Sequence, residues 1–216
     1  MMKNKILLIL LALSLAVTAC NLPSIKSKWD TPLPTPTPDD GWGWYAGDGM
    51  RISLPRSYNQ RDIALDLPAI IETIKTFFGD NSNTLTSLID DLEGNVAWWG
   101  YDAEAPAIAP TRLLVLHNSK LAGTALSMLS TMVKMLGGKD ADSIESKSLE
   151  LGGRNLVVFS QSTQTSAWVA YAFKENGYLW VVVFMTTPAN LAAQQANFER
   201  SAASIQINVQ APTEQP

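Results

Sequence analysis

The sequence predicts an α+β domain: a central antiparallel sheet covered by helices on both faces, an α/β/α sandwich. Three observations lead to this class. Hydrophobic and polar residues alternate over Met50–Pro55, which is the period of a half-buried strand. Large apolar residues between Ile70 and Phe78 follow a helical period instead. Residues Leu179–Met185 are apolar without alternation, so this strand must be central and covered on both faces.

The first predicted elements form a β-hairpin that begins the domain at residue 41. A stretch rich in aromatic residues, 41–46, precedes the turn sequence Gly47-Asp48-Gly49, and the strand Met50–Pro55 follows. Glycine-containing pairs of this kind favour a tight reversal between two strands. Pro55 ends the second strand because it has no amide hydrogen to donate.

Two helices are predicted next, the first starting at Asp66. Asp66 is the expected cap, Pro68 fits the first turn and Gly79 is the expected stop. The expected buried residues of this helix are Ile70, Ile71, Ile74, Phe77 and Phe78. A second, shorter helix is expected to bury Leu85, Leu88, Ile89 and Leu92.

Two strands, 96–101 and 112–117, and a long helix, 120–136, follow in the prediction. Trp98 and Trp99 are adjacent in a strand and should face opposite sides of the sheet. Ser119 is the expected cap of the long helix, and Gly137-Gly138 its stop. Its expected buried stripe is Leu121, Ala125, Met128, Met132 and Met135. A methionine stripe at this spacing indicates core packing, with a ligand groove as the alternative.

The last third of the chain predicts a β meander and a closing helix. Gly152-Gly153 joins strands 143–151 and 155–160, and residues 174–177 join strands 167–173 and 178–185. The closing helix begins with Thr187 as cap and Pro188, and its expected buried side contains Leu191, Gln195, Phe198 and Ala202. A terminal strand, Ser204–Ile207, and a polar, disordered tail, 208–216, complete the chain.

The first twenty residues predict export and lipid attachment. Lys3 and Lys5 precede an apolar run, Ile6–Val17, which is too short for a transmembrane helix of roughly 20 residues. The sequence Val17-Thr18-Ala19-Cys20 resembles a bacterial lipobox, which implies cleavage before Cys20 and acylation of its thiol. The alternative is an ordinary secretory signal with a spare cysteine. We therefore expect a signal peptide, 1–19, and a domain held at the cell membrane, facing outside the cytoplasm.

Residues 20–40 predict a spacer between the lipid and a single globular domain, 41–207. Prolines alternate with other residues over Thr31–Pro38, which favours extended polyproline II. At about 3.1 Å per residue such a tether spans up to roughly 60 Å. The alternative is a ligand for a proline-recognition module. Cys20 is the only cysteine, so once it is acylated no disulfide is expected. Acidic residues exceed basic ones, with no long basic run, which disfavours a nucleic-acid partner.

Several segments together resemble the Mog1/PsbP-like family and related bacterial lipoproteins. They are the strand Arg51-Ile52-Ser53-Leu54-Pro55, the meander segment 149–154, and the closing helix that leads into Ser204-Ile205-Gln206-Ile207. The resemblance covers nearly all of residues 41–207. It implies a central antiparallel sheet between helical layers and a binding or assembly factor that is not an enzyme, so it supplies no catalytic residue.

The catalytic and metal-binding patterns in the sequence are incomplete. The single histidine, His117, is interpreted as a strand-end residue, with a functional role as the alternative. Oxygen-rich segments 80–83 and 140–145 lack the spacing of a calcium loop and are interpreted as helix or strand caps. Asp90 and Asp91 are neighbours on a predicted helix and do not face each other as a catalytic pair would. We expect no cofactor and no metal.

Aromatic residues are the remaining functional lead. Most should be core residues, and any that stay exposed would form a binding patch for a sugar ring or a protein. The candidates are Trp42, Trp44, Tyr45, Trp98, Trp99 and Tyr101. The resulting hypothesis is a non-enzymatic, lipid-anchored binding or assembly-factor domain that engages an envelope or secreted protein. The alternatives are a carbohydrate- or cell-wall-binding module, and a hydrolase whose carboxylates come from distant parts of the chain.

Overall fold

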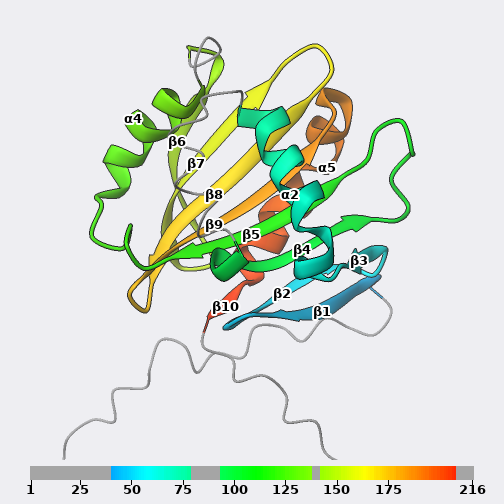
Figure 1. Cartoon of the computed structure of the whole chain (residues 1–216), viewed down its shortest axis with the longest axis horizontal. Coiled ribbons are helices and arrows are strands. Elements are labelled where there is room, and N and C mark those ends of the chain that lie inside the picture. Colours follow the sequence, from blue (N-terminus) through cyan, green and yellow to red (C-terminus); the bar gives the residue numbers. More distant parts are fainter. Residues whose placement is uncertain (1–39, 79–92, 138–141, 208–216) are drawn as a thin grey trace, which may run out of the picture. The chain divides into compact units, whose positions relative to one another are not determined.

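The computed structural model describes residues 40–78, 93–137 and 142–207 (Figure 1). No helix within these ranges is long and apolar enough to cross a membrane. The helices are α2 (Ile63–Phe78), α4 (Leu126–Gly137), α5 (Pro188–Ser204) and a 3₁₀ turn, η1 (Glu93–Asn95). The strands are β1 (Trp42–Gly47), β2 (Met50–Pro55), β3 (Tyr58–Gln60), β4 (Val96–Asp102), β5 (Arg112–Asn118), β6 (Glu145–Leu151), β7 (Arg154–Ser162), β8 (Ala167–Glu175), β9 (Tyr178–Thr186) and β10 (Gln206–Ile207).

The described strands form two antiparallel sheets. The larger sheet has the order β3-β4-β5-β9-β8-β7-β6, and the smaller one has the order β1-β2-β10. Strand β9 pairs along its whole length with β8 on one side, and residues 179–185 pair with β5 on the other. Its predicted central position is therefore confirmed.

The large sheet separates two hydrophobic cores. The α5-side core contains Trp98, Trp180, Val182 and Phe184 from the large sheet, together with residues of β2 and α5. The α2-side core contains Trp99, Leu179, Val183 and Met185, together with residues of α2 and α4. Successive residues of β9 enter opposite cores, because side chains alternate along a strand. The prediction that Trp98 and Trp99 face opposite sides is confirmed.

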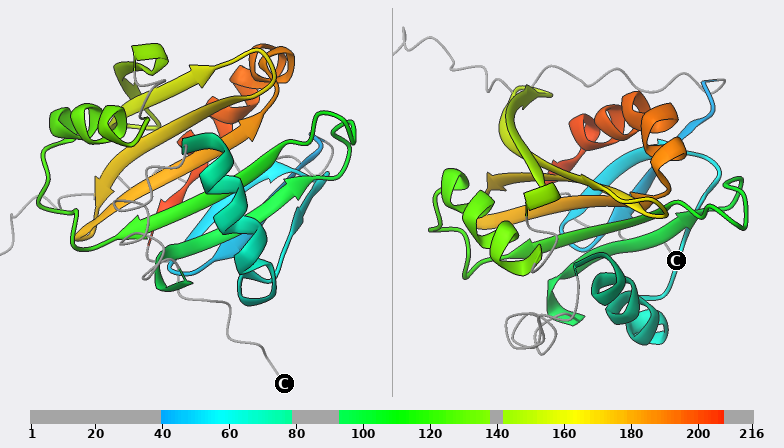
Figure 2. Two further views of the ribbon diagram at one scale, coloured as in Figure 1. Left: turned by 45° about the horizontal axis from the view of Figure 1, so that its top comes forward. Right: turned by 90° about the horizontal axis from the view of Figure 1, so that it is seen from above.

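The small sheet and α5 lie together against one face of the large sheet, and α2 lies on the other (Figure 2). The Phe198 ring of α5 stacks on Phe184 of β9 at 4.3 Å between ring centres. At its end, α5 meets β2: the buried Ser53 backbone N–H donates to Ser204 Oγ at 2.9 Å. The end of α5 thus lies beside β2, and the chain continues into β10, which pairs with β2.

The predicted hairpins are confirmed, including the turns that join them. In the β8–β9 turn, Asn176 and Gly177 have φ values of 52° and 80°, the left-handed conformation that a two-residue turn requires. Gly152 and Gly153 occupy the same region between β6 and β7. The β1–β2 hairpin turns at Asp48-Gly49, and the Asp48 N–H donates to the Ala97 carbonyl of β4.

The fold class is confirmed only at the coarser level. The described residues form an α+β domain of mostly antiparallel sheet, as predicted. One sheet between two purely helical layers is not what they show, because the small sheet makes up much of the layer on the α5 side. The sequence pattern did not reveal that the β1–β2 hairpin stands apart from the main sheet, since both sheets use the same two-residue period.

Two helix starts differ from the prediction. Helix α2 begins at Ile63, where Asp62 accepts the Leu65 N–H, so Asp66 is not the cap. Helix α4 begins at Leu126 and not near Lys120. The side chain of Asn118 accepts the Leu121 N–H and starts a turn before the helix. The region predicted as the second short helix, 80–92, lies outside the described residues.

The predicted buried faces of two helices are wrong at single positions, while Leu191, Phe198 and Ala202 of α5 pack against the core as predicted. In α4, Leu129 is buried while Met128 is 60% exposed, so the proposed methionine stripe is wrong at that position. Met132 packs partly against the α2-side core, and the Met135 side chain lies outside the described residues. In α5, Gln195 is exposed, and Gln194 is the partly buried neighbour. Thr187 precedes α5 without a side-chain capping bond, and Pro188 occupies the first turn as predicted.

The Ser53–Ser204 contact gives a stability prediction. Replacing Ser204 with Ala leaves the buried Ser53 N–H without its acceptor, and an unsatisfied buried donor costs about 1–3 kcal/mol. We expect the free energy of unfolding of S204A, measured by urea denaturation, to fall by that amount. The control S146A removes an exposed hydroxyl from β6 and should change stability by less than about 0.5 kcal/mol. Equal stability of S204A and the wild type would contradict the assignment.

Candidate functional site

The structure buries three of the six candidate aromatic residues: Trp42 is 8% exposed, and Trp98 and Trp99 lie in the two hydrophobic cores. Trp98 is fully buried and Trp99 is 4% exposed, and they enter opposite cores. Neither ring has a face available to a ligand. The buried Trp98 Nε1 makes no hydrogen bond with any other described residue. Both tryptophans therefore serve to hold β4 between the two cores.

Trp42 and Trp44 of β1 are each paired with an arginine. The Arg200 guanidinium of α5 lies over the Trp42 ring at 3.9 Å from its centre, and the Arg51 guanidinium of β2 lies over Trp44 at 4.9 Å. Arg200 also binds the Asp40 carboxylate at 2.6 Å. This contact holds the pKa of Asp40 below its usual value. One face of each ring is thus already occupied by a cation of the same chain.

Tyr45 and Tyr101 lie apart from this pair. Tyr45 packs edge-on against Trp98, and its hydroxyl donates to the Arg56 carbonyl at 3.3 Å. Tyr101 is 38% exposed and follows Trp99 at the spacing that puts both on the α2 side of β4. The six candidates are therefore divided between two faces and the core, and Trp44 and Tyr101 do not share one patch.

His117 lies among aromatic rings at the end of β5. Its ring stacks on Trp180 at 5.0 Å and lies 5.3 Å from Tyr178. The buried Nε2 atom faces the Asp48 carboxylate at 3.6 Å, which is too long for a hydrogen bond. This agrees with the interpretation of His117 as a strand-end packing residue.

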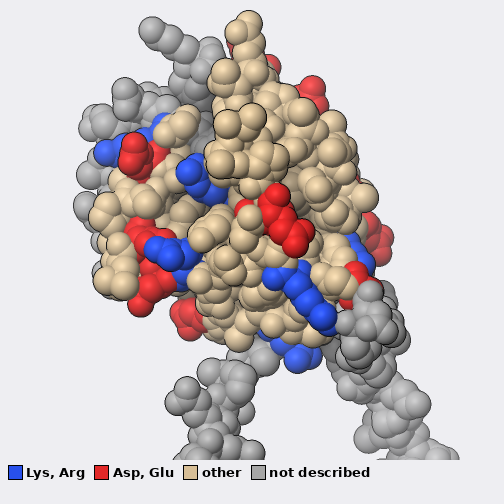
Figure 3. Space-filling view, turned by 90° about the vertical axis from the view of Figure 1, so that its right-hand side faces the viewer, with Lys and Arg blue, Asp and Glu red and all other residues tan. Residues whose placement is uncertain are grey.

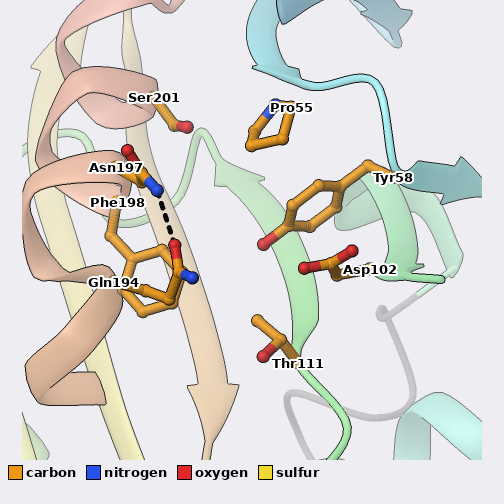
Figure 4. Close-up of a pocket in the computed structure, with 8 residues that line it drawn as sticks. All are labelled: Pro55, Tyr58, Asp102, Thr111, Gln194, Asn197, Phe198 and Ser201. Carbon is orange, nitrogen blue, oxygen red and sulfur yellow. Dashed lines mark hydrogen bonds between the residues drawn. The ribbon is translucent and has the colours of Figure 1, made fainter. Parts of the chain in front are cut away.

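A cleft between α5 and the ends of β2, β3, β4 and β5 is the candidate functional site (Figure 4). We call it the α5 cleft. Its eight lining residues are Pro55, Tyr58, Asp102, Thr111, Gln194, Asn197, Phe198 and Ser201. None of them was among the predicted site residues. The free space of about 10 Å³ is enough for about one water molecule.

Strand pairing forms the sheet wall of the cleft. Tyr58 of β3 lies directly opposite Asp102 of β4 in the antiparallel register, which brings the two side chains together. Figure 4 shows the phenol oxygen and the carboxylate directed toward the same space. The close approach of β3 depends on Gly100, where a Cβ would collide with the Asn59 carbonyl and the Trp98 ring.

Helix α5 forms the opposite wall. Gln194, Asn197 and Ser201 are three and four residues apart and so lie on one side of the helix. The Asn197 amide donates to Gln194 Oε1 at 2.5 Å, which orders both side chains (Figure 4). Phe198 holds α5 against β9 through its stacking on Phe184.

The cleft contains an unused hydroxyl. Tyr58 is 4% exposed, yet its hydroxyl forms no hydrogen bond with any other described residue. Burial, with a smaller effect of the Asp102 charge, raises the pKa of Tyr58, so the hydroxyl stays protonated. Thr111 is already engaged with the Thr186 hydroxyl at 3.0 Å. A hydroxyl that is directed into a recess can bind a ligand or a water molecule, as donor or as acceptor.

The chemistry of the lining residues favours binding. Asp102 is the one charged residue among the eight, so the cleft has no second carboxylate, histidine or cysteine for acid–base or nucleophilic work. Across the described ranges, no three His, Cys, Asp or Glu side chains gather closely enough to hold a metal ion.

One signal in the sequence could have indicated the cleft. Gln194, Asn197 and Ser201 form a polar stripe beside the apolar residues Leu191, Phe198 and Ala202 of the closing helix. Such a polar stripe beside the buried face indicates that this side of the helix lies at the edge of the core, where a cleft can form. Nothing local marks Tyr58 or Asp102, because their pairing depends on where β3 joins the sheet.

Asp66 links α2 to β4 and gives a pH-dependent prediction. Its carboxylate binds Arg61 at 2.9 Å and accepts the Trp99 indole N–H at 3.2 Å. The Arg61 hydrogen bond, with smaller help from Trp99, lowers the pKa of Asp66 below 3.8. A lowered folded-state pKa stabilises the fold above the unfolded value, and this contribution is lost as pH falls through the folded value.

We therefore expect D66N to be less stable than the wild type at pH 7, and the difference to shrink as the pH is lowered below about 4. Urea midpoints measured from pH 7 to pH 2.5 test this. The control E145Q neutralises an exposed carboxylate on β6 and should show no closing difference. A difference between D66N and the wild type that stays constant with pH would contradict the role of Asp66.

Comparison with known proteins finds similarity only at the level of solved structures. No protein-family model and no curated protein matches the sequence. The chain is similar to the cyanobacterial PsbP protein CyanoP from Synechocystis, with 10% identity over 77% of this chain and 92% of that chain, at a TM-score of 0.46. LpqN of Mycobacterium tuberculosis, described as involved in cell envelope biogenesis, gives 8% identity over 74% and 83%, at a TM-score of 0.37. A protein from Bacteroides thetaiotaomicron gives 10% identity over 79% and 49%, at a TM-score of 0.44.

Proposed function

We propose that this chain is a lipid-anchored, extracytoplasmic binding or assembly-factor domain that is not an enzyme and engages an envelope or secreted protein. The proposed export and lipid attachment are supported by the sequence Val17–Cys20 and by the lysines ahead of the apolar run. A Mog1/PsbP-like relationship is part of the proposal, and it rests on the strand Arg51–Pro55 and the helix that leads into Ser204–Ile207.

The observation that carries the proposal is the juxtaposition of a polar cleft and an exposed apolar loop. The β4–β5 loop, 103–110, starts directly after Asp102 of the cleft and contains one charged residue, Glu104. Ile108 in this loop is 94% exposed. We call the α5 cleft and this loop together the binding end.

The loop is held in place by hydrogen bonds. The Ala103 N–H donates to the Ser57 carbonyl, and the Asp102 carboxylate accepts the Glu104 N–H. The Asn190 side chain of α5 donates to the Ala109 carbonyl at 3.1 Å. An ordered loop loses little conformational entropy when a partner covers it, which favours binding.

The face from which this loop projects is mostly uncharged. Figure 3 views the molecule from the right-hand side of Figure 1, where the β4–β5 loop lies, and uncharged residues cover much of that face, with scattered acidic and basic ones. Few charged residues are typical of the centre of a surface that binds another protein.

The carbohydrate alternative has less support. A sugar ring stacks on a free aromatic face, and Trp42 and Trp44 each carry an arginine over the ring. Trp98 and Trp99 are buried. For this alternative, Trp44 and Tyr101 remain as separate candidate contacts, one on each side of the molecule.

Lipid attachment is tested by intact-mass analysis of the chain purified from membranes. We expect the mature chain to begin at Cys20 and to carry at least two acyl chains, because one chain alone gives only marginal membrane binding. The C20S variant, which cannot form the thioether, should carry none. An unacylated wild-type Cys20 would contradict the proposed anchor.

The binding end is tested by photocrosslinking in intact cells. A benzophenone amino acid at Ile108 should give a discrete protein adduct, because this side chain lies at the proposed contact. The matched control carries the same probe at Met128, which is 60% exposed on α4 and should give no such adduct. Adducts of equal yield at both positions, or none at Ile108, would remove the support for a partner at this end.

A further inference from the structure

The α5 cleft offers unused hydrogen-bond acceptors together with one negative charge. The Tyr58 hydroxyl has no partner among the described residues. One oxygen of Asp102 accepts the Glu104 N–H at 3.0 Å, and no other described residue binds the carboxylate. A ligand that donates hydrogen bonds can bind both the carboxylate and the Tyr58 oxygen, and a positive charge on it would strengthen these bonds.

Among the described residues, no lysine or arginine side chain binds the Asp102 carboxylate. The eight lining residues include no lysine or arginine. The nearby Arg200 is held by Asp40 and Trp42, and Arg56 donates to the Trp42 carbonyl at 3.2 Å. The negative charge at the cleft is therefore left for a group from outside.

Two aromatic rings line the same recess. Tyr58 comes from the sheet wall and Phe198 from the helix wall. Cations are attracted to the faces of aromatic rings, and more strongly where water is excluded. A carboxylate, a phenol oxygen and two rings together suit an ammonium group, which has three donors and no acceptor.

We propose that the α5 cleft binds the ammonium head group of a lysine side chain carried by the partner protein. This inference rests on the proposed function, because it names the group that the partner inserts beside the β4–β5 loop.

The size of the cleft favours a side chain over a free amine. Space for about one water molecule admits an ammonium nitrogen and excludes a guanidinium group, which has four heavy atoms. A single buried nitrogen can give a Kd no better than about 0.1 M by itself. The remaining affinity must come from surface around the cleft, which a protein partner would cover.

The test uses the full-length mature chain in detergent micelles, labelled with [3,5-¹³C]tyrosine. The chain has five tyrosines, and Y58F identifies the Tyr58 signal. Removing a hydroxyl that makes no bond should leave the fold intact. The probes are acetyl-Gly-Lys-Gly-amide, its arginine counterpart, and acetyl-Gly-norleucine-Gly-amide, which has a similar length and no charge.

We expect the lysine peptide, at concentrations up to about 0.1 M, to shift the Tyr58 signal in a concentration-dependent way, and the arginine and norleucine peptides to leave it unchanged. D102N should weaken the binding by about tenfold or more, because the charge-assisted bond is lost. The side-chain amide of the D102N variant keeps an oxygen for the Glu104 N–H, so the loop is preserved. E150Q removes an exposed carboxylate on β6 and should bind like the wild type.

Equal shifts with the norleucine peptide, unchanged binding by D102N, or an equal loss in E150Q would overturn the cation site. Butylammonium that binds in the micromolar range would overturn the protein source and assign the cleft to a free amine. If the Ile108 probe gives its adduct while the lysine peptide fails, the partner-binding function stands and the cation site falls. If the lysine peptide shifts the Tyr58 signal while the Ile108 probe gives no adduct, the cation site stands and the partner at the binding end loses its support.

Discussion

Strand β9 is apolar on both faces, and the arrangement of the other layers depends on covering both. Each buried Val, Leu or Phe side chain contributes about 1.5–3 kcal/mol through its removal from water. Residues of β9 enter both cores, so neither face of the sheet can be left to solvent. On one side α2 and α4 provide the cover. On the other, α5 meets Phe184 through Phe198, and the β1–β2 hairpin fills the area that α5 leaves open.

The α5 cleft is a consequence of this shared cover. Helix α5 and the small sheet differ in shape, so they do not cover the large sheet without a gap. The gap between them lies at the ends of β3 and β4 and forms the cleft. The polar residues of the cleft occupy this boundary, where apolar packing is incomplete. Tyr58 shows the compromise: its ring packs 6.4 Å from Trp98 in the core, while its hydroxyl reaches the recess.

Much of the fold could be predicted from the sequence, because hairpins and buried strands depend on local chemistry. Asn176-Gly177 and Gly152-Gly153 specify their turns wherever the strands end up. Helix boundaries were harder, since capping by Asp62 and the turn at Asn118 compete with hydrophobic spacing. Met128 was misplaced because a helix that starts six residues late presents a different face.

The candidate site could not be predicted in the same way. The aromatic residues are predicted site residues because tryptophan is common in binding sites, but large rings also bury much apolar area in a core. Whether Trp42 is free depends on Arg200, which lies 158 positions later in the chain. The pairing of Tyr58 with Asp102 depends on sheet order and on the absence of a side chain at Gly100. These are long-range relations that no local pattern contains.

The Asp40–Arg200 ion pair has a mechanical consequence. Residue 40 is where the N-terminal segment joins the domain, and Trp42 lies opposite Pro55, which lines the α5 cleft. A tensile load that enters at Asp40 and leaves through a partner at the cleft would follow a short path through Trp42, Arg200 and the first rungs of the β1–β2 ladder. Within the large sheet, β3 and β4 at one edge would bear this load, because they carry Tyr58 and Asp102 of the cleft. Such a domain could withstand pulling at one corner without shear across its central strands.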